Sequence, residues 1–206
     1  LLELWMCRPW FEIKDEAQKL GVIHFSSNYE LYASMSNRFS ATLRQFAPRV
    51  EVYSIDESFL DLTGVNADFN VLGRQVKDTV LQWTGLGIGV GIGHTNTLAK
   101  LANHCAKRVK GFDGVCDLTS MSLAEQKRIM EGLEPSKVWG VGSRLEKRLV
   151  ELGVANAWRL RNASPRRIRD EFGVVLERTV KELNGEPWIE FEEELPEAKQ
   201  VMSSRS

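Results

Sequence analysis

The stretch VEVYSIDESFLDLTG, residues 50–64, decides how this sequence is interpreted. Two strand-length runs of alternating apolar residues, VEVYSI and SFLDLT, stand on either side of the acidic pair Asp56-Glu57. Neighbouring residues on a continuous strand point to opposite faces of a sheet, so two adjacent carboxylates converge only at a bend or a bulge. The pattern therefore predicts a β-hairpin with Asp56 and Glu57 at its bend.

The acidic pair itself has two interpretations. Converging carboxylates repel one another unless a cation neutralises them, and hard oxygen ligands suit Mg²⁺ or Mn²⁺. Asp-Glu is also a poor choice for a tight hairpin turn, which favours Asn-Gly or Asp-Gly. An ordinary exposed acidic hairpin tip explains the same two residues, and the pair alone leaves both alternatives open.

Composition excludes several classes of protein. The chain has 206 residues, 43% of them hydrophobic and 27% charged, as in a soluble globular protein with a real core. It contains no apolar run long enough to span a membrane and no visible secretory signal. Cys7, Cys105 and Cys116 lack CxxC spacing, which argues against a disulfide framework or zinc site and predicts a cytoplasmic protein. Because the sequence opens at Leu1 and stops at Ser206 without clear limits, we expect a piece of a longer protein.

Apolar periodicity predicts an α+β fold. Helices are expected over 9–20, from Ser26, Ser27 or Asn28 towards Pro48, over about 68–83, and from His94 or Thr95 to about Arg108. The segment GLGIGVGIG, residues 85–93, predicts a strand with one face made of glycines, which marks the close approach of a backbone or a ligand. Short helices with glycine turns follow a domain boundary near 117–121, so a sheet with packed helices precedes a small all-helical module.

The segment VWGVGSRLEKRLVELGV, residues 138–154, has the pattern of a helix-hairpin-helix. Gly140 and Gly142, on either side of Val141, would let backbone N–H groups face a phosphate at a helix N-terminus, with Arg144 and Lys147 following. Nine basic residues and two acids lie between Lys137 and Arg169, which favours a polyanionic partner. A plain helix connection with glycine caps and a solvated basic face are the alternatives.

A third signal is Lys100, in the helix that follows the glycine strand. It lies off the apolar stripe of that helix, and a lysine facing a metal pair holds a triphosphate as a point charge. A solvated helix face is the alternative interpretation of this residue.

Together these segments resemble the Y-family translesion DNA polymerases, and among them the UmuC-like catalytic subunits of bacterial polymerase V. The resemblance runs in family order across nearly the whole chain from Pro9, and it is carried by FSSNYELYASMSNR (25–38), PRVEVYSIDESFLDLTGV (48–65), GVGIGHTNTLAKLANHCAK (89–107), VWGVGSRLEKRL (138–149) and VVLERTVKELNGEPW (174–188).

The resemblance implies four regions and a role for each predicted site residue. The regions are the remainder of the fingers (1–28), an incomplete palm (29–117), a helical thumb with the helix-hairpin-helix (118–188), and an acidic linker leading into a little-finger domain (189–206). Asp56 and Glu57 would be the metal-binding catalytic carboxylates, and Lys100 would reach the phosphates of the incoming nucleotide. The DNA backbone would be held by Gly140, Val141, Gly142, Arg144 and Lys147.

The implied activity is error-prone, template-directed DNA synthesis in SOS damage tolerance. A nucleotide passes from a dNTP to the primer 3′-hydroxyl with two Mg²⁺ ions, for which Mn²⁺ substitutes. The implied partners are primer–template DNA, dNTP, a processed UmuD-type dimer and a recombinase filament, with no membrane. The family's first metal aspartate and its steric-gate aromatic would precede Leu1, and Asn96 stands where many members carry lysine. We therefore expect the 206-residue piece alone to be inactive.

Two other functions compete with this one. The first is a non-catalytic DNA-binding protein that uses only the helix-hairpin-helix module. The second is a palm-type nucleotidyl cyclase, which the basic module disfavours because such an enzyme needs no grip on a duplex.

Overall fold

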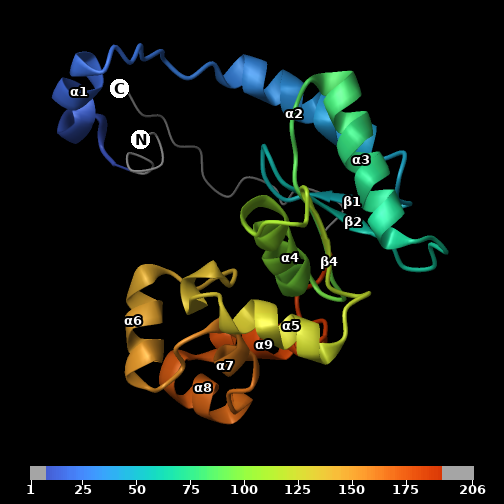
Figure 1. Ribbon diagram of the computed structural model, residues 1–206, viewed down its shortest axis with the longest axis vertical. Helices are drawn as coiled ribbons and strands as arrows, with labels where there is room; N and C mark the ends of the chain where they lie inside the picture. The colour runs from blue at the N-terminus through green and yellow to red at the C-terminus, as the bar shows by residue number, and fades with distance from the viewer. Residues whose placement is uncertain (1–7, 192–206) are drawn as a thin grey trace. The chain divides into compact units, whose positions relative to one another are not determined.

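A computed structural model describes residues 8–191 of the chain (Figure 1). Two compact units divide at Ser34 and Met35. In the first unit, α1 (Trp10–Lys19) follows Pro9 and buries Ile13 and Ala17, as the sequence predicts for 9–20. Asn28 accepts a hydrogen bond from the backbone N–H of Leu31 at 3.0 Å. Of the three predicted starting residues, Asn28 therefore caps the helix α2 (Tyr29–Leu43).

The second unit contains the predicted hairpin. Strands β1 (Arg49–Val52) and β2 (Ser58–Asp61) pair antiparallel, with Val52 opposite Ser58. The N–H groups of Tyr53 and Ser54 both donate to the carbonyl oxygen of Glu57, at 3.1 and 3.0 Å. This pairing closes the loop on Asp56 and Glu57, so the prediction that the two acids occupy the bend is confirmed.

The glycine strand packs directly against a helix backbone. A Cβ atom added to Gly91 would lie 2.0 Å from the backbone nitrogen of Asn103, and one added to Gly93 would lie 2.7 Å from that of Ala99. Both contacts belong to α4 (Asn96–Arg108), which starts at its cap Thr95. Of the two predicted reasons for a glycine face, the structure shows the close approach of another backbone.

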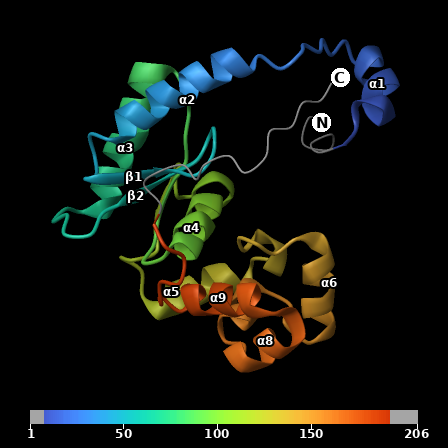
Figure 2. The same cartoon turned by 180° about the vertical axis from the view of Figure 1, so that it is seen from behind.

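The strand within that segment is shorter than predicted, and its partner was not predicted. Only β3 (Val90–Ile92) has strand pairing, and it lies parallel to β4 (Val115–Asp117). Helix α3 (Phe69–Thr84) begins after Asp68, whose carboxylate accepts from the N–H groups of Asn70 and Val71. In both views α2 and α3 lie on one side of the strands and α4 on the other (Figures 1 and 2).

The buried core has two main parts in this unit. Phe39, Val50, Val76 and Val80 belong to the cluster that joins α2, β1 and α3. A larger cluster runs without a break from Leu98 in α4 through the helical module that follows. That module consists of α5 (Leu123–Glu131), the 3₁₀ turn η2 (Pro135–Lys137), α6 (Ser143–Glu151), α7 (Ala157–Arg161), α8 (Pro165–Phe172) and α9 (Val174–Leu183).

The α+β fold class is thereby confirmed, with helices and strands first and helices alone afterwards. The four predicted domain ranges stay a prediction, and most of the range 189–206 lies outside the described residues. The continuous core between α4 and α9 means that no break in packing marks a boundary near 117–121. Among residues 8–191, no helix has the length and apolar character needed to cross a membrane.

Candidate active site

The two carboxylates at the hairpin bend have different partners. Asp56 is exposed, and its Oδ1 accepts a hydrogen bond from Ser54 Oγ at 2.8 Å. Glu57 is half-buried, and its Oε2 lies 2.9 Å from Lys100 Nζ in an ion pair. Within the described part of the chain, no group of three or more His, Cys, Asp or Glu side chains could hold a metal ion. The metal-binding role of Asp56 and Glu57 stays a prediction.

Lys100 is enclosed by aromatic rings as well as by Glu57. Its Nζ lies 4.4 Å from the ring centroid of Tyr53 and 4.9 Å from that of Trp139. The Tyr53 ring meets Phe59 and Trp139 edge-on, at centroid distances of 5.7 and 5.4 Å. Cation–π contacts of this kind hold the lysine side chain in place. Lys100 therefore joins the hairpin, α4 and the loop before α6, a cluster that spacing along the sequence did not reveal.

The predicted DNA-binding loop lies between η2 and α6. Gly140 has a φ of +84°, in the left-handed region that favours glycine, and Val141 is buried in the core below it. A Cβ atom added to Gly142 would meet nothing within 4 Å, so the backbone there is open to an approaching group. Arg144 and Lys147 are exposed on α6. The structure brings the five predicted residues together on one loop and helix start, while their contact with DNA stays a prediction.

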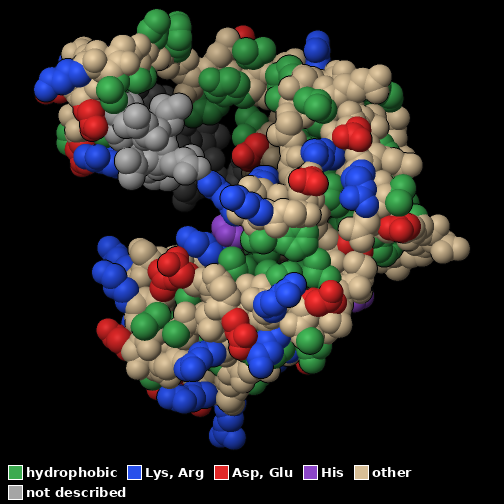
Figure 3. All heavy atoms as spheres, viewed as in Figure 1, with side chains coloured by type: hydrophobic (Ala, Val, Ile, Leu, Met, Phe, Trp, Pro, Cys, Tyr) green, Lys and Arg blue, Asp and Glu red, His purple; other side chains and the backbone are tan. Residues whose placement is uncertain are grey.

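The basic residues between Lys137 and Arg169, here called the basic block, fall into two sets. Figure 3 shows Lys and Arg side chains over the surface of the helical module. Four of them bond within it: Arg148, Arg159 and Arg161 donate to backbone carbonyl groups, and Arg169 pairs with Glu177 at 3.2 Å. The other basic residues after Lys137, which are exposed, are Arg144, Lys147, Arg166 and Arg167. Part of the block therefore makes contacts within the module, which favours the alternative of an ordinary solvated basic face. The exposed part is available to a polyanion.

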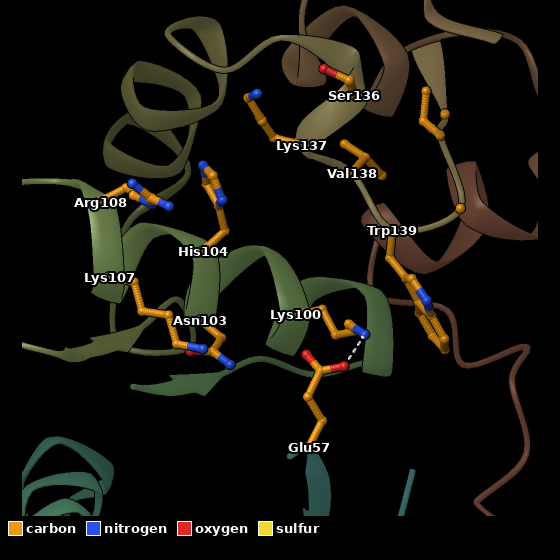
Figure 4. A pocket seen from close by; sticks show the side chains of 13 residues that line it. Glu57, Lys100, Asn103, His104, Lys107, Arg108, Ser136, Lys137, Val138 and Trp139 are labelled. Carbon is orange, nitrogen blue, oxygen red and sulfur yellow. Dashed lines mark hydrogen bonds and ion pairs between the residues drawn. The ribbon is translucent and has the colours of Figure 1, made fainter. Parts of the chain in front are cut away.

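A cavity of about 650 Å³ connects the acid hairpin with the glycine loop (Figure 4). Glu57 and Lys100 lie at one end, and the loop from Val138 to Gly142 forms one wall. Asp56, Arg144 and Lys147 are not among its lining residues. Burial, and then the nearby charges of Lys137 and Arg108, hold the pKa of His104 in this cavity below its ordinary value.

Glu182 is a buried carboxylate that fixes the start of α4. Its Oε2 accepts from the N–H of Thr97 at 2.9 Å, and its Oε1 accepts from the N–H groups of Trp188 and Ile189 at 2.9 and 3.0 Å. The hydroxyl of Thr95 donates to the Glu182 carbonyl at 2.9 Å. Three backbone donors satisfy this charge, so it is a structural anchor for the helix that carries Lys100. Nothing in the sequence pattern distinguishes it from the exposed glutamates nearby.

Comparison with known proteins gives consistent matches. Residues 6–104 match the impB/mucB/samB family. The chain is 50% identical over 201 residues to the protein UmuC of Salmonella typhimurium, covering 96% of this chain and 47% of the relative. The chain spans about half the length of the curated relatives it matches.

Two solved structures are similar in fold. The Y-family DNA polymerase chimera Dbh-Dpo4(243-245)-Dbh gives a TM-score of 0.70 at 25% identity, over 89% of this chain and 52% of that one. The DinB structure from Sulfolobus solfataricus gives a TM-score of 0.65 at 26% identity, over 83% of this chain and 50% of that one.

Proposed function

Because residues 6–104 match the impB/mucB/samB family and the chain is 50% identical to UmuC over 201 residues, we propose that the protein belongs to this family and is a template-directed DNA polymerase of the translesion type. It would transfer a nucleotide from a dNTP to the 3′-hydroxyl of a primer. The observation that carries the proposal is the position of Glu57, which stands at the hairpin bend, 2.9 Å from Lys100, at the end of a basic cavity that reaches the glycine loop. One connected surface thus holds Glu57, Lys100 and the glycine loop, and Asp56 stands next to Glu57 in the chain.

The chemistry of the two carboxylates fits a divalent cation. Both side chains present hard oxygen ligands, and Asp56 is exposed. The ammonium group of Lys100 pairs with Glu57 and occupies the place that a metal cation would take. We propose that these residues hold Mg²⁺, two ions in the active protein, with Mn²⁺ as a substitute. A bound cation would neutralise phosphate charge and make the primer hydroxyl a better nucleophile.

The remaining residues would bind and orient the substrates. Lys100 would move from Glu57 towards the phosphates of the nucleotide, because a flexible lysine acts as a mobile point charge. Gly140, Val141 and Gly142 would let a DNA backbone come close, and Arg144 and Lys147 would add charge contacts that do not depend on sequence. Primer–template DNA and dNTP are therefore the proposed ligands. The UmuD-type dimer and the recombinase filament rest on the family resemblance alone.

The replacement Asp56→Ala tests the catalytic role. In the full-length protein we expect it to abolish primer extension while DNA binding is retained, because Asp56 is exposed and, within residues 8–191, its side chain bonds only to Ser54. The matched control is Asp78→Ala, which removes an exposed carboxylate from α3 and should change neither property. Primer extension is measured with a labelled primer, and DNA binding by fluorescence anisotropy.

Two outcomes would count against the proposal. Extension retained by Asp56→Ala would remove Asp56 from the catalytic set. A wild-type protein that binds DNA but extends no primer would instead support the alternative, a non-catalytic DNA-binding protein.

A further inference from the structure

Cys105 of α4 and Cys116 of β4 are two buried thiols that the proposed function does not use. Both side chains have 0% exposure, and both belong to the core cluster that begins at Leu98. Both are free cysteines, and neither lines the cavity. The helix and the strand that carry them pack against each other (Figure 1).

The pairing of β3 with β4 directs Cys116 towards α4. Cys116 is the partner of Gly91, and partners on neighbouring parallel strands point to the same face of the sheet. A Cβ atom added to Gly91 would meet the backbone of Asn103, so this face is the one that α4 covers. The next residue, Val115, lies on the other face, 2.7 Å from a Cβ atom added to Gly73 in α3. Cys116 therefore lies under α4, beside a glycine that lets the helix come unusually close.

This close approach brings the two thiols into contact. A hydrogen bond from Cys116 holds the pKa of the Cys105 thiol below its ordinary value, although burial opposes that shift. The same hydrogen bond, and then burial, raise the pKa of Cys116. The thiolate is the form of cysteine that attacks an oxidant. The pair thus consists of an attacking sulfur, Cys105, with a second sulfur beside it.

The chain between the two cysteines gives a small oxidant a route to them. Residues 107–111, which follow the buried end of α4, are all exposed. Strand β4 has three residues and, within residues 8–191, pairs with β3 alone. A short strand with one paired edge opens locally at a lower free energy than the whole protein unfolds. The thiols are therefore reached without global unfolding.

We propose that Cys105 and Cys116 form an oxidisable dithiol, which a hydroperoxide converts into a reversible disulfide between α4 and β4. The Cys105 thiolate attacks one oxygen of the peroxide, and the O–O bond breaks. The other oxygen takes up the thiol proton and leaves as an alcohol, or as water when the oxidant is hydrogen peroxide. Cys105 is then a sulfenic acid. The sulfur of Cys116 attacks the Cys105 sulfur, the S–S bond forms, and the hydroxyl group leaves with the Cys116 proton as water.

The electrons balance between the two reactants. The two thiols together lose two electrons, and the peroxide gains them. A thiol reductant such as dithiothreitol restores both cysteines by thiol–disulfide exchange. Transient disulfides of this kind occur in reducing compartments, so the pair agrees with a sequence that lacks a disulfide framework. The bond would tie α4, the helix that carries Lys100, to the sheet.

Peptide mapping of the oxidised protein tests the proposal. Trypsin cuts the chain after Lys107, so Cys105 and Cys116 fall in separate peptides, residues 101–107 and 111–127. The full-length protein is treated with hydrogen peroxide, its remaining thiols are blocked with N-ethylmaleimide in urea, and the digest is examined by mass spectrometry. We expect the two peptides to be joined, at a mass two hydrogens below their sum, and to separate after dithiothreitol.

The same oxidation in urea is the control, because unfolding removes the native arrangement of the thiols. There Cys105 should pair with Cys7, in the peptide of residues 1–8, as well as with Cys116. In the native protein the link to Cys116 should predominate, and Cys7→Ala should form it as wild type does. Native peptides that stay separate at a peroxide dose that joins them in urea would overturn the proposal, and so would native links to Cys7 as frequent as those to Cys116.

A variant separates the roles of the two sulfurs. In Cys116→Ala the second sulfur is absent, so Cys105 should remain a sulfenic acid and be labelled by dimedone, which should not label the wild-type protein. A Cys105 that dimedone never labels in this variant would contradict its role as the attacking sulfur. All of these results are obtained without primer extension, so a failure of the proposed polymerase function and a failure of the dithiol are distinguished.

Discussion

Replacing Gly91 by alanine should displace the helix that carries Lys100. The added Cβ would lie 2.0 Å from the backbone nitrogen of Asn103 and 2.3 Å from the carbonyl oxygen of Ala99, where ordinary contact begins at 3.4 Å. The helix or the strand must therefore move by about 1.4 Å, the difference between 3.4 and 2.0 Å. Overpacking of this kind usually costs about 1–3 kcal/mol, and backbone on both sides leaves no flexible side chain to yield. We expect Gly91→Ala to lower the free energy of unfolding by about 3 kcal/mol, measured by urea denaturation.

Gly87, in the same glycine-alternating segment, provides the matched control. A Cβ atom there would meet nothing within 4 Å, and the residue does not have a positive φ. Alanine at Gly87 should leave stability unchanged or raise it by about 0.4–1 kcal/mol, because it restricts the unfolded chain. If the free energies of unfolding of the two variants differ by less than about 0.5 kcal/mol, the close packing of α4 on the glycine face does not stabilise this region.

Three further changes test other parts of the structure. Glu182→Ala leaves one buried and two part-buried backbone N–H groups without their acceptor and should cost about 3 kcal/mol in urea denaturation, while the isosteric Glu182→Gln should cost less. The pKa of His104 is lowered on folding, so the unfolded chain binds more protons than the folded protein. The free energy of unfolding should therefore fall as the pH drops below about 6.5. His104→Gln should make that fall smaller. Gly142→Val places its side chain in open space, so it should leave stability within about 0.5 kcal/mol while weakening DNA binding equally for all sequences; a sequence-dependent loss would contradict backbone recognition.

Local patterns predicted most of the fold. Alternation around Asp56 and Glu57 predicted the hairpin, and apolar spacing with caps such as Thr95 predicted the helices, because both depend on neighbours within a few residues. The glycine alternation also predicted a close approach. Strand β4 was missed because its three residues are too few to show a period.

The predictions about the site were limited by long-range contacts. Lys100 was singled out as a lysine that faces a metal pair and holds a triphosphate, whereas its ion pair with Glu57 joins residues 43 positions apart. Its contact with Trp139 and the anchoring of α4 by Glu182 also depend on how distant segments pack. A single sequence gives each residue's type and local period, and neither determines such partners.

The contacts of α4 connect the fold to the chemistry. The glycine face, the anchor at Glu182 and the ion pair of Lys100 all involve this one helix. A displacement of α4 at one of these contacts therefore changes the distances at the other two. If the 1.4 Å shift expected for Gly91→Ala moved Lys100 directly away from Glu57, their 2.9 Å separation would become about 4.3 Å, beyond the ~4 Å limit of an ion pair. Glycine destabilises a strand interior, but here it lets α4 pack close enough to place Lys100 next to Glu57. Under the proposed function, the full-length protein carrying Gly91→Ala should therefore lose more primer extension than its loss of folded protein explains, whereas Gly87→Ala, whose added Cβ meets nothing within 4 Å, should lose neither.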